Sequence, residues 1–152
     1  QVPAEELEWF NTIGYTIGGM MVFPGNSIDR KMTINGARGF HLHIKDRFDL
    51  TVECIRRHYL KESSPLSETL QRYADFFELF EDFRGYVEFF LLQDMVSKDF
   101  IEVRFCLPFN DFKTSPLPSN KEAYLSYKQC SVEFIEARNS RIRAYCQANG
   151  LA

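Results

Sequence analysis

The chain contains 152 residues, 45% of them hydrophobic and 15% aromatic, a size and composition typical of one globular domain spanning residues 1–152. Its formal net charge of −3 argues against a general nucleic-acid binder, because affinity for a phosphate backbone comes from clustered Lys and Arg side chains. No apolar run approaches the roughly 20 residues that cross a bilayer, so we expect a soluble protein without a membrane span.

Residues 4–11 are expected to form one helical turn, and residues 16–43 are predicted to form a β-hairpin. Residues 15–23, YTIGGMMVF, favour a strand in which two consecutive glycines introduce a bulge. Turn residues at 24–27, PGNS, separate it from a short strand at 31–34, and a second turn is expected at 35–39, NGARG. The glycines of this region are therefore interpreted as bend-forming residues.

Helices are expected in the middle of the chain. Residues 46–61 have one apolar helical face, formed by Phe48, Val52, Ile55 and Tyr59. Ser64 followed by Pro65 predicts the start of a second helix, whose apolar positions continue to Phe80. Residues 85–96, GYVEFFLLQDMV, are apolar on nearly every side and predict a central helix covered by its neighbours.

The last third of the chain begins with a predicted strand at 99–107, where apolar and charged residues alternate. A proline-rich loop at 107–118 follows, and a capping box of Ser119 and Glu122 predicts a helix that continues to about residue 148. Such a helix is longer than a small domain, so it either kinks or projects and packs on another subunit. The predicted fold class is α+β: a helix-rich single domain with a small antiparallel sheet and a long C-terminal helix.

The four cysteines, Cys54, Cys106, Cys130 and Cys146, are widely spaced. They contain no C-x-x-C motif, so neither a zinc ribbon nor a redox pair is indicated. We expect buried, reduced thiols and a cytoplasmic location.

Three segments carry a family resemblance: MTINGARGFHLHIKDRFDLTVECIRRHY at 32–59, YADFFELFEDFRGYVEFFLLQDMV at 73–96, and VEFIEARNSRI at 132–142. Together they resemble a conserved bacterial domain family of unknown function, over a region from about Thr16 to Ile142. The resemblance implies a bacterial source. It implies no activity and no catalytic residues.

The glycine-rich region suggests two kinds of ligand site. His41 and His43 face the same way if the segment is extended, and Asp46 could complete a metal site; the alternative is a pair of surface histidines. The amides of the glycines, with Arg38, could hold a phosphate, but neither a G-x-G-x-x-G nor a G-K-[ST] fingerprint is present. We therefore predict no metal and no cofactor.

Asp94 lies in the last turn of the predicted central helix, where a negative charge opposes the helix dipole. A basic partner is expected, and the candidates are Arg38, Arg47 and Arg104. Such a pair is either a structural tie or the polar floor of a pocket. A two-carboxylate hydrolase is a further hypothesis, but the sequence offers too many acidic residues to choose among them.

Basic clusters at 54–59 and 136–143 could contact nucleic acid only if both lay on one face. Acidic residues at helical spacing within them favour solvated helix faces instead.

Two functional hypotheses remain. The preferred one is a binding or interaction module that uses surplus aromatic surface, chiefly on the long C-terminal helix, as a homo-oligomer or with a protein partner. The alternative is a small enzyme or ligand-binding domain, with a pocket between the hairpin and the central helix that accepts a phosphate-bearing or other small molecule. The candidate pocket residues are Arg38, His41, His43, Arg47, Asp94 and Arg104.

Overall fold

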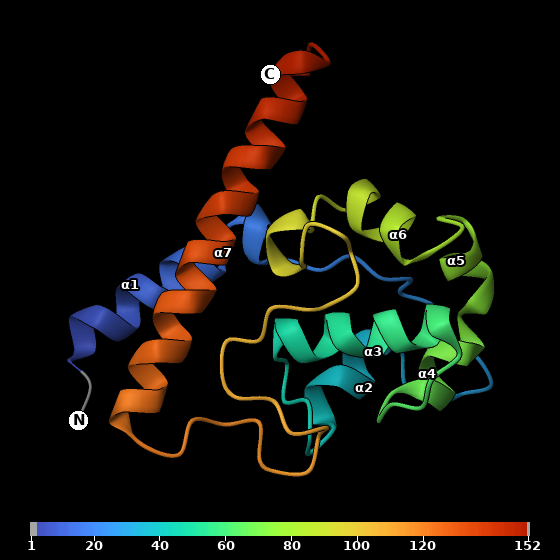
Figure 1. The fold of residues 1–152 in the computed structure, drawn as a ribbon, viewed down its shortest axis with the longest axis horizontal. Coiled ribbons are helices and arrows are strands. Elements are labelled where there is room, and N and C mark those ends of the chain that lie inside the picture. The colour runs from blue at the N-terminus through green and yellow to red at the C-terminus, as the bar shows by residue number, and fades with distance from the viewer. Residues whose placement is uncertain (1–2, 152) are drawn as a thin grey trace.

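Residues 3–151 are described by a computed structural model, and they are built from helices (Figure 1). Among them are seven α-helices: α1 Ala4–Gly14, α2 Ile34–Phe40, α3 Phe48–Leu60, α4 Ser67–Arg72, α5 Ala74–Glu78, α6 Phe83–Phe89 and α7 Lys121–Ala148. Two short 3-10 turns are η1 Ile17–Gly19 and η2 Gln93–Met95. Within residues 3–151 the β-pairing is limited to one bridge between Val96 and Val103, so the predicted α+β class is wrong and the fold is all-helical.

An irregular segment, residues 20–33, replaces the predicted hairpin. Several of its carbonyls accept hydrogen bonds from side chains on or beside helices rather than from a second strand. The Met20 carbonyl accepts a 2.6 Å hydrogen bond from Arg138 of α7. The Asn26 carbonyl accepts a 2.7 Å hydrogen bond from the hydroxyl of Tyr73. Because buried backbone groups need partners but not strand partners, these contacts make a sheet unnecessary.

The NGARG stretch forms most of helix α2 instead of the predicted turn. Thr33 caps this helix, since its hydroxyl accepts a hydrogen bond from the Gly36 amide at 3.2 Å. Glycine in a helix costs about 1 kcal/mol relative to alanine, but Ile34 at the first position is completely buried and anchors the helix in the core. Tertiary packing therefore overrides the local turn preference.

Three other predicted elements differ from the structure. The central helix predicted at 85–96 ends at Phe89, and Leu91 then adopts a left-handed conformation with φ of 56° before η2 begins. The helix predicted after Ser64 is broken at Tyr73 into α4 and α5. The strand predicted at 99–107 contributes only its bridge residue.

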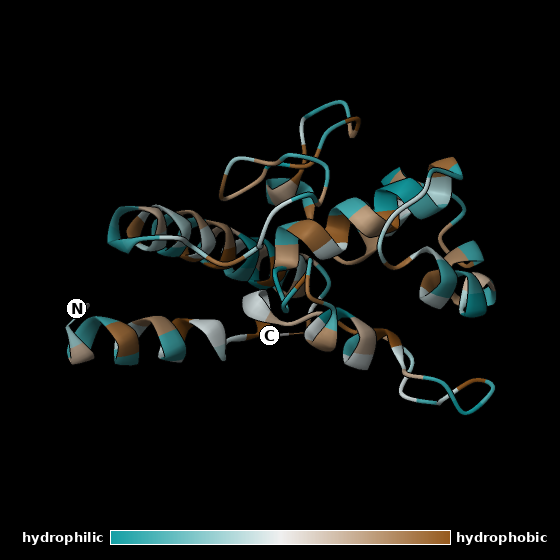
Figure 2. Cartoon of the chain, turned by 90° about the horizontal axis from the view of Figure 1, so that it is seen from below, coloured by the Kyte–Doolittle hydropathy of each residue, from teal (hydrophilic) through white to brown (hydrophobic). Residues whose placement is uncertain are grey.

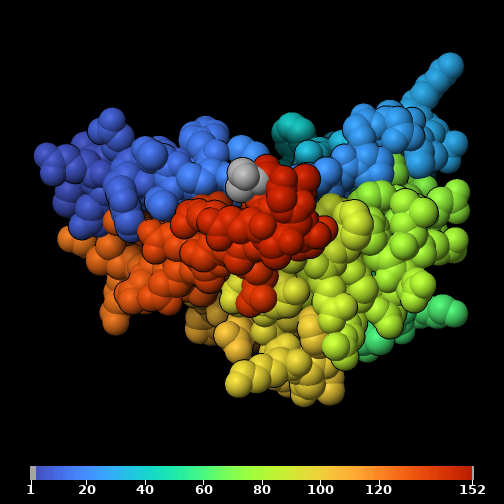
Figure 3. All heavy atoms as spheres, turned by 90° about the horizontal axis from the view of Figure 1, so that it is seen from above, coloured from blue at the N-terminus to red at the C-terminus, as the bar shows by residue number. Residues whose placement is uncertain are grey.

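The helices α3 and α7 and the irregular segment at 107–118 confirm the sequence predictions. Asn120, rather than Ser119, caps α7, because its side chain accepts a 2.9 Å hydrogen bond from the Ala123 amide. The 28 residues of α7 extend over about 42 Å. Its last turns stand out from the rest of the molecule (Figure 1), and seen from above they lie in front of the other elements (Figure 3).

Helix α3 lies at the centre of the core, and every residue from Asp49 to Ile55 is buried. Much of the aromatic content packs beside its C-terminal half, in a cluster of edge-on and tilted rings. Its members include Tyr59, Phe76, Phe77, Phe80, Tyr86 and Phe90. Such pairs contribute about 0.5–1.5 kcal/mol each beyond the area they bury. The high phenylalanine count therefore largely serves the core.

Helix α1 packs against the N-terminal half of α7 but contains no buried residue. Apolar and polar residues are mixed along it (Figure 2). Lys128 of α7 holds it by an ion pair to Glu6 at 3.0 Å and by a cation–π contact with Trp9 at 5.2 Å. Phe10 packs edge-on against Tyr124, with 6.5 Å between the ring centroids. The helix is thus attached by a few side chains rather than by a core.

A disulfide joins Cys106 to Cys130, with 5.4 Å between their Cα atoms. The prediction of reduced thiols is therefore wrong for these two residues, because sequence spacing cannot reveal spatial proximity. Cys54 is a buried free thiol, and its burial raises the pKa to about 12, while Cys146 is free and partly exposed. Disulfides persist mainly in oxidising compartments, which weighs against the predicted cytoplasmic location.

The thiol arrangement predicts a stepwise result with iodoacetamide. The native protein should be labelled at Cys146 alone, since alkylation requires an accessible thiolate and Cys54 is buried. Unfolding without a reductant should add Cys54, and reduction should add Cys106 and Cys130. Peptide mass spectrometry measures each step. Labelling of Cys106 in native, unreduced protein would contradict the disulfide.

Acid should destabilise the protein through His58. Its ring lies 4.9 Å from that of Phe77, and burial lowers its pKa, so the folded state favours the neutral imidazole. The unfolded chain binds the proton more readily, so this contribution to stability is present above about pH 6.5 and is lost as the pH falls below it. Urea unfolding of His58→Gln between pH 5 and 8 should show a shallower pH dependence than the parent protein; an equal dependence would contradict this.

Candidate functional site

A cleft of about 420 Å³ lies between α1, the start of α3 and the N-terminal half of α7. Its apolar walls are Phe10, Met21, Phe48, Met95, Phe134 and Ile135. Its polar lining includes Arg38, Asp46, Asp49, Tyr127 and Ser131. Small-molecule sites are typically clefts of this volume, with apolar walls and a few convergent polar groups. This cleft is therefore the candidate site.

Arg38 reaches the cleft from α2, and its side chain is only 11% exposed. Its Nε donates to the Thr51 hydroxyl at 2.9 Å, and its two terminal nitrogens donate to the carboxylate of Asp46 at 3.0 Å and to the carbonyl of Asp46 at 2.7 Å. Burial lowers the pKa of Arg38, and the charge of Asp46 opposes that shift. A guanidinium has five N–H donors, so two remain beyond these three contacts.

A turn after α2 places Asp46 over Arg38. Lys45 and Asp46 both adopt left-handed backbone conformations, with φ of 47° and 61°. The Asp46 amide donates to the Arg38 carbonyl at 3.1 Å, which closes the turn. The Asp46 side chain itself is 69% exposed, so it covers the mouth of the site rather than its interior.

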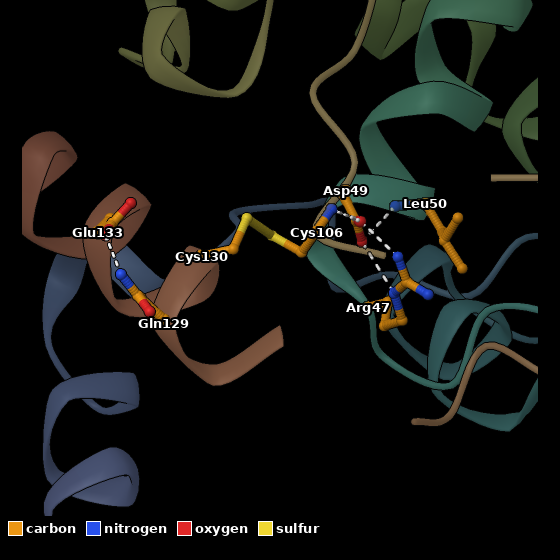
Figure 4. The surroundings of a disulfide bond; sticks show 7 residues. All are labelled: Arg47, Asp49, Leu50, Cys106, Gln129, Cys130 and Glu133. Atoms are coloured by element: carbon orange, nitrogen blue, oxygen red, sulfur yellow. Dashed lines mark hydrogen bonds and ion pairs between the residues drawn. A yellow bond between two sulfur atoms is a disulfide. The ribbon is translucent and has the colours of Figure 1, made fainter. Parts of the chain in front are cut away.

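A buried ion pair of Arg47 and Asp49 lies beside the cleft (Figure 4). Arg47 donates through two nitrogens to Asp49, whose oxygens also accept from the amides of Leu50 at 3.0 Å and Cys106 at 2.9 Å. The remaining terminal nitrogen of Arg47 donates to the Pro116 carbonyl at 3.0 Å. Every Asp49 oxygen is therefore occupied, which gives this pair a structural role.

The disulfide supports the same wall of the cleft. Cys106 lines the cleft, and its partner Cys130 lies on α7 (Figure 4). The backbone amide of Cys106 is held by Asp49. One covalent bond and one hydrogen bond therefore position the irregular segment between η2 and α7 against the site.

Two hydroxyl-bearing residues line the cleft from consecutive turns of α7. These are Tyr127 and Ser131, four residues apart on one helix face. Burial raises the pKa of Tyr127, and the negative charge of Asp49 adds to the effect. Tyr127 is therefore protonated at neutral pH and can donate a hydrogen bond to a ligand.

The predicted site residues are only partly brought together. Arg38 lines the cleft and Arg47 lies beside it with its donors engaged. His41 and His43 follow α2 and are not among the lining residues; the His43 amide donates to Nδ1 of His41 at 3.1 Å. Burial lowers the pKa of His41, and the nearby His43 makes a smaller contribution in the same direction.

Asp94 and Arg104 also lie away from the cleft lining. The partner of Asp94 is Arg141 of α7, with N–O distances of 3.0 and 3.1 Å, and not one of the three predicted arginines. Arg104 is exposed, and its backbone amide donates to the Met95 carbonyl at 2.8 Å. The Asp94 pair is thus a tie between η2 and α7.

The structure gives the glycines a packing role. The Gly18 amide donates to the Asn139 side chain at 2.7 Å, and an added Cβ would lie 2.5 Å from the Ile135 carbonyl. This glycine therefore allows η1 to approach α7 closely. Among residues 3–151, His, Cys, Asp and Glu side chains form no group of three or more that could hold a metal ion.

The basic clusters are engaged in local contacts. Arg56 and Arg57 both donate to the buried carboxylate of Glu53, at 2.8–2.9 Å. Arg138, in the second cluster, is buried. It donates to the carbonyl of Gly18 in η1 and to that of Phe90, which directly follows α6. These contacts support the structural interpretation of both clusters. In the part of the chain that the structure describes, no helix is both long and apolar enough to span a bilayer.

Tyr127, Ser131 and the disulfide were not predicted as parts of a site. In the sequence, Tyr127 has the spacing of an apolar residue on the long helix, and its hydroxyl gives no separate signal. The spacing of Tyr127, Cys130 and Ser131 on one helix is the pattern that could have drawn attention to this face. The sequence suggests Asp46 as a metal ligand or as one of several hydrolase carboxylates, but not as the partner of Arg38.

Comparison with known proteins gives one match. Residues 1–142 match the model of a family of unknown function, DUF6994, which confirms the resemblance identified from the sequence. No curated protein and no solved structure matches the chain.

Proposed function

Because the chain belongs to the DUF6994 family, whose function is unknown, we propose a function from the cleft itself: the protein binds a small molecule between α1, α3 and α7. The observation that carries this proposal is the convergence of Arg38, Tyr127 and Ser131 inside an apolar cleft. Polar groups placed on apolar walls are what small-molecule sites use to orient a ligand.

The proposal is for binding rather than for catalysis. The lining residues contain no histidine, and the one lining cysteine is in the disulfide. Asp49 is saturated with hydrogen bonds, so it is not free to act as a base. Among the lining groups that could transfer a proton, the Asp46 carboxylate and the Tyr127 hydroxyl are left, and both suit ligand recognition.

A fragment screen by ¹H–¹⁵N NMR tests the proposal. Fragments that bind should shift the amide signals of lining residues such as Gly19, Asp46 and Ser131. A Ser131→Phe substitution fills the cleft and should abolish those shifts. The control is Ser140→Phe, at an exposed position of the same helix, which should leave them unchanged. Fragment shifts that map elsewhere, or that survive Ser131→Phe, would contradict the proposal.

A second candidate function is self-association through α7. Its last turns project from the molecule (Figure 1), and Tyr145 there is 52% exposed. Ile142 and Cys146, also in these turns, are only partly covered. A helix end that carries apolar residues on one face and extends beyond its own domain suits packing against a second copy of the chain.

Light scattering on the full chain tests this association. The parent protein should have the mass of a dimer, and Tyr145→Glu should have the mass of a monomer, because a charge in an apolar contact is costly to bury. Glu136→Gln, at an exposed position nearer the middle of α7, is the control and should remain dimeric. A parent protein that is monomeric at high concentration would contradict the association.

A further inference from the structure

We propose that the cleft binds a monocarboxylate with an apolar body, whose carboxylate takes the place of Asp46 on Arg38. This inference rests on the proposed small-molecule site and names the class of ligand that the site accepts. It follows from the charges, the donors and the walls of the cleft.

The charge balance of the cleft leaves one cation for a ligand. Arg38 is the only basic residue among the lining residues. Of the two lining acids, Asp49 is neutralised by Arg47, so its charge is already matched. Asp46 is the remaining acid and is the present counter-ion of Arg38.

The Asp46 carboxylate is a displaceable counter-ion. Its side chain is 69% exposed, against 11% for Arg38, and one hydrogen bond of 3.0 Å joins the two side chains. The pair is open to solvent on the Asp46 side only, and water solvates the carboxylate well once it is released. The Asp46 carbonyl can keep its hydrogen bond to Arg38 when the side chain moves away. A ligand carboxylate can therefore replace the side chain without disturbing the turn.

Arg38 then offers a suitable set of donors. Thr51 and the Asp46 carbonyl use two of the five N–H groups of the guanidinium, which leaves three. A planar guanidinium matches a carboxylate through two parallel hydrogen bonds. Tyr127 and Ser131 supply hydroxyl groups to further polar atoms of the ligand.

The ligand charge is limited to one. A phosphate dianion would bring two negative charges to a site with a single available cation, close to the carboxylate of Asp49. A neutral ligand would give up the charge-assisted hydrogen bonds to Arg38. A monoanion balances the site, so the phosphate-bearing ligand considered from the sequence is disfavoured.

The walls determine the rest of the ligand. Three phenylalanines, two methionines and one isoleucine surround the polar end: Phe10, Phe48, Phe134, Met21, Met95 and Ile135. Aromatic rings offer flat apolar surfaces, and methionine side chains adapt to irregular shapes. An aromatic or branched aliphatic body fits this surface.

Calorimetric titration with three matched probes tests the inference: 3-phenylpropanoate, 3-phenylpropan-1-ol and phenyl phosphate. At pH 7.5 the carboxylate should bind at least tenfold more tightly than the alcohol and the phosphate. Asp46→Asn should raise the affinity for 3-phenylpropanoate about threefold, because the competing carboxylate is gone. Arg38→Met should lower that affinity more than tenfold and leave the affinity for the alcohol unchanged.

The outcomes separate the ligand class from the site. Three results would overturn the ligand class while the site stands. They are an affinity for the alcohol equal to that for 3-phenylpropanoate, a higher affinity for phenyl phosphate, and no increase in the affinity for 3-phenylpropanoate in Asp46→Asn. Failure of 3-phenylpropanoate to bind, when other fragments shift the cleft signals in the NMR screen, would do the same. If no fragment binds at the cleft, both proposals fail. If Arg38→Met does not fold, Arg38→Gln replaces it, because its amide is neutral and can still donate to Thr51. Loss of the carboxylate preference in that variant supports the inference, and its retention overturns it.

Discussion

Replacing Arg47 with methionine is expected to lower the free energy of unfolding by about 3–5 kcal/mol, because the Asp49 carboxylate would remain buried without its counter-ion. The two side chains are 7% and 1% exposed, so water cannot take the place of the guanidinium. The substitution also removes the donor to the Pro116 carbonyl. Urea unfolding followed by circular dichroism measures the loss.

A matched control and a double variant test whether the unpaired buried charge of Asp49 causes the loss of stability. Arg84→Met breaks an exposed pair with Glu88 and should cost less than about 1 kcal/mol. Arg47→Met combined with Asp49→Asn should recover part of the loss, because no buried charge is then left unpaired. A loss below about 1 kcal/mol in Arg47→Met alone would show that the pair is not buried as described.

Replacing Arg138 with methionine is expected to cost about 3 kcal/mol, because it leaves three backbone carbonyls without their donor. The guanidinium donates to the carbonyls of Gly18 at 3.2 Å, Met20 at 2.6 Å and Phe90 at 2.9 Å. It also lies 5.7 Å from the ring centre of Phe48. These contacts attach η1 and the end of α6 to α7. Hydrogen exchange should show faster exchange around residues 16–20 in the variant.

Arg141→Met is the control for this substitution, since Arg141 lies one turn later on the same helix. Its pair with Asp94 is partly exposed, at 40% and 27%, and its removal should cost less than about 1 kcal/mol. Equal losses in the two variants would contradict the role assigned to Arg138.

The helices that the sequence predicted well are those whose signals are local. In α3 the apolar spacing from Phe48 to Tyr59 is long enough to define a helix face without tertiary information. The predicted hairpin failed because its glycines and extended residues were interpreted by local rules. Their partner is Arg138, which is 118 positions from Met20 in sequence, and no local pattern reveals such a contact.

The residues of the candidate site also divide into those that the sequence indicates and those that only the structure reveals. Arg38 and Arg47 were predicted as partners of Asp94, and that pairing is wrong because Asp94 pairs with Arg141. Both arginines nevertheless lie at or beside the cleft. Tyr127 was hidden because a tyrosine on the apolar face of a helix looks like a core residue. The disulfide required the loop and α7 to be placed in space, because Cys106 and Cys130 are 24 positions apart.

The attachment of the N-terminal segment to α7 has a consequence for synthesis on the ribosome. The contacts that hold Glu6, Phe10 and Gly18 are made by Lys128, Tyr124 and Asn139 respectively. Glu6, Phe10 and Gly18 thus acquire these partners only after the ribosome has synthesised α7. Until then α1 and η1 remain undocked on the nascent chain, although helix α3 and its aromatic neighbours have already been made.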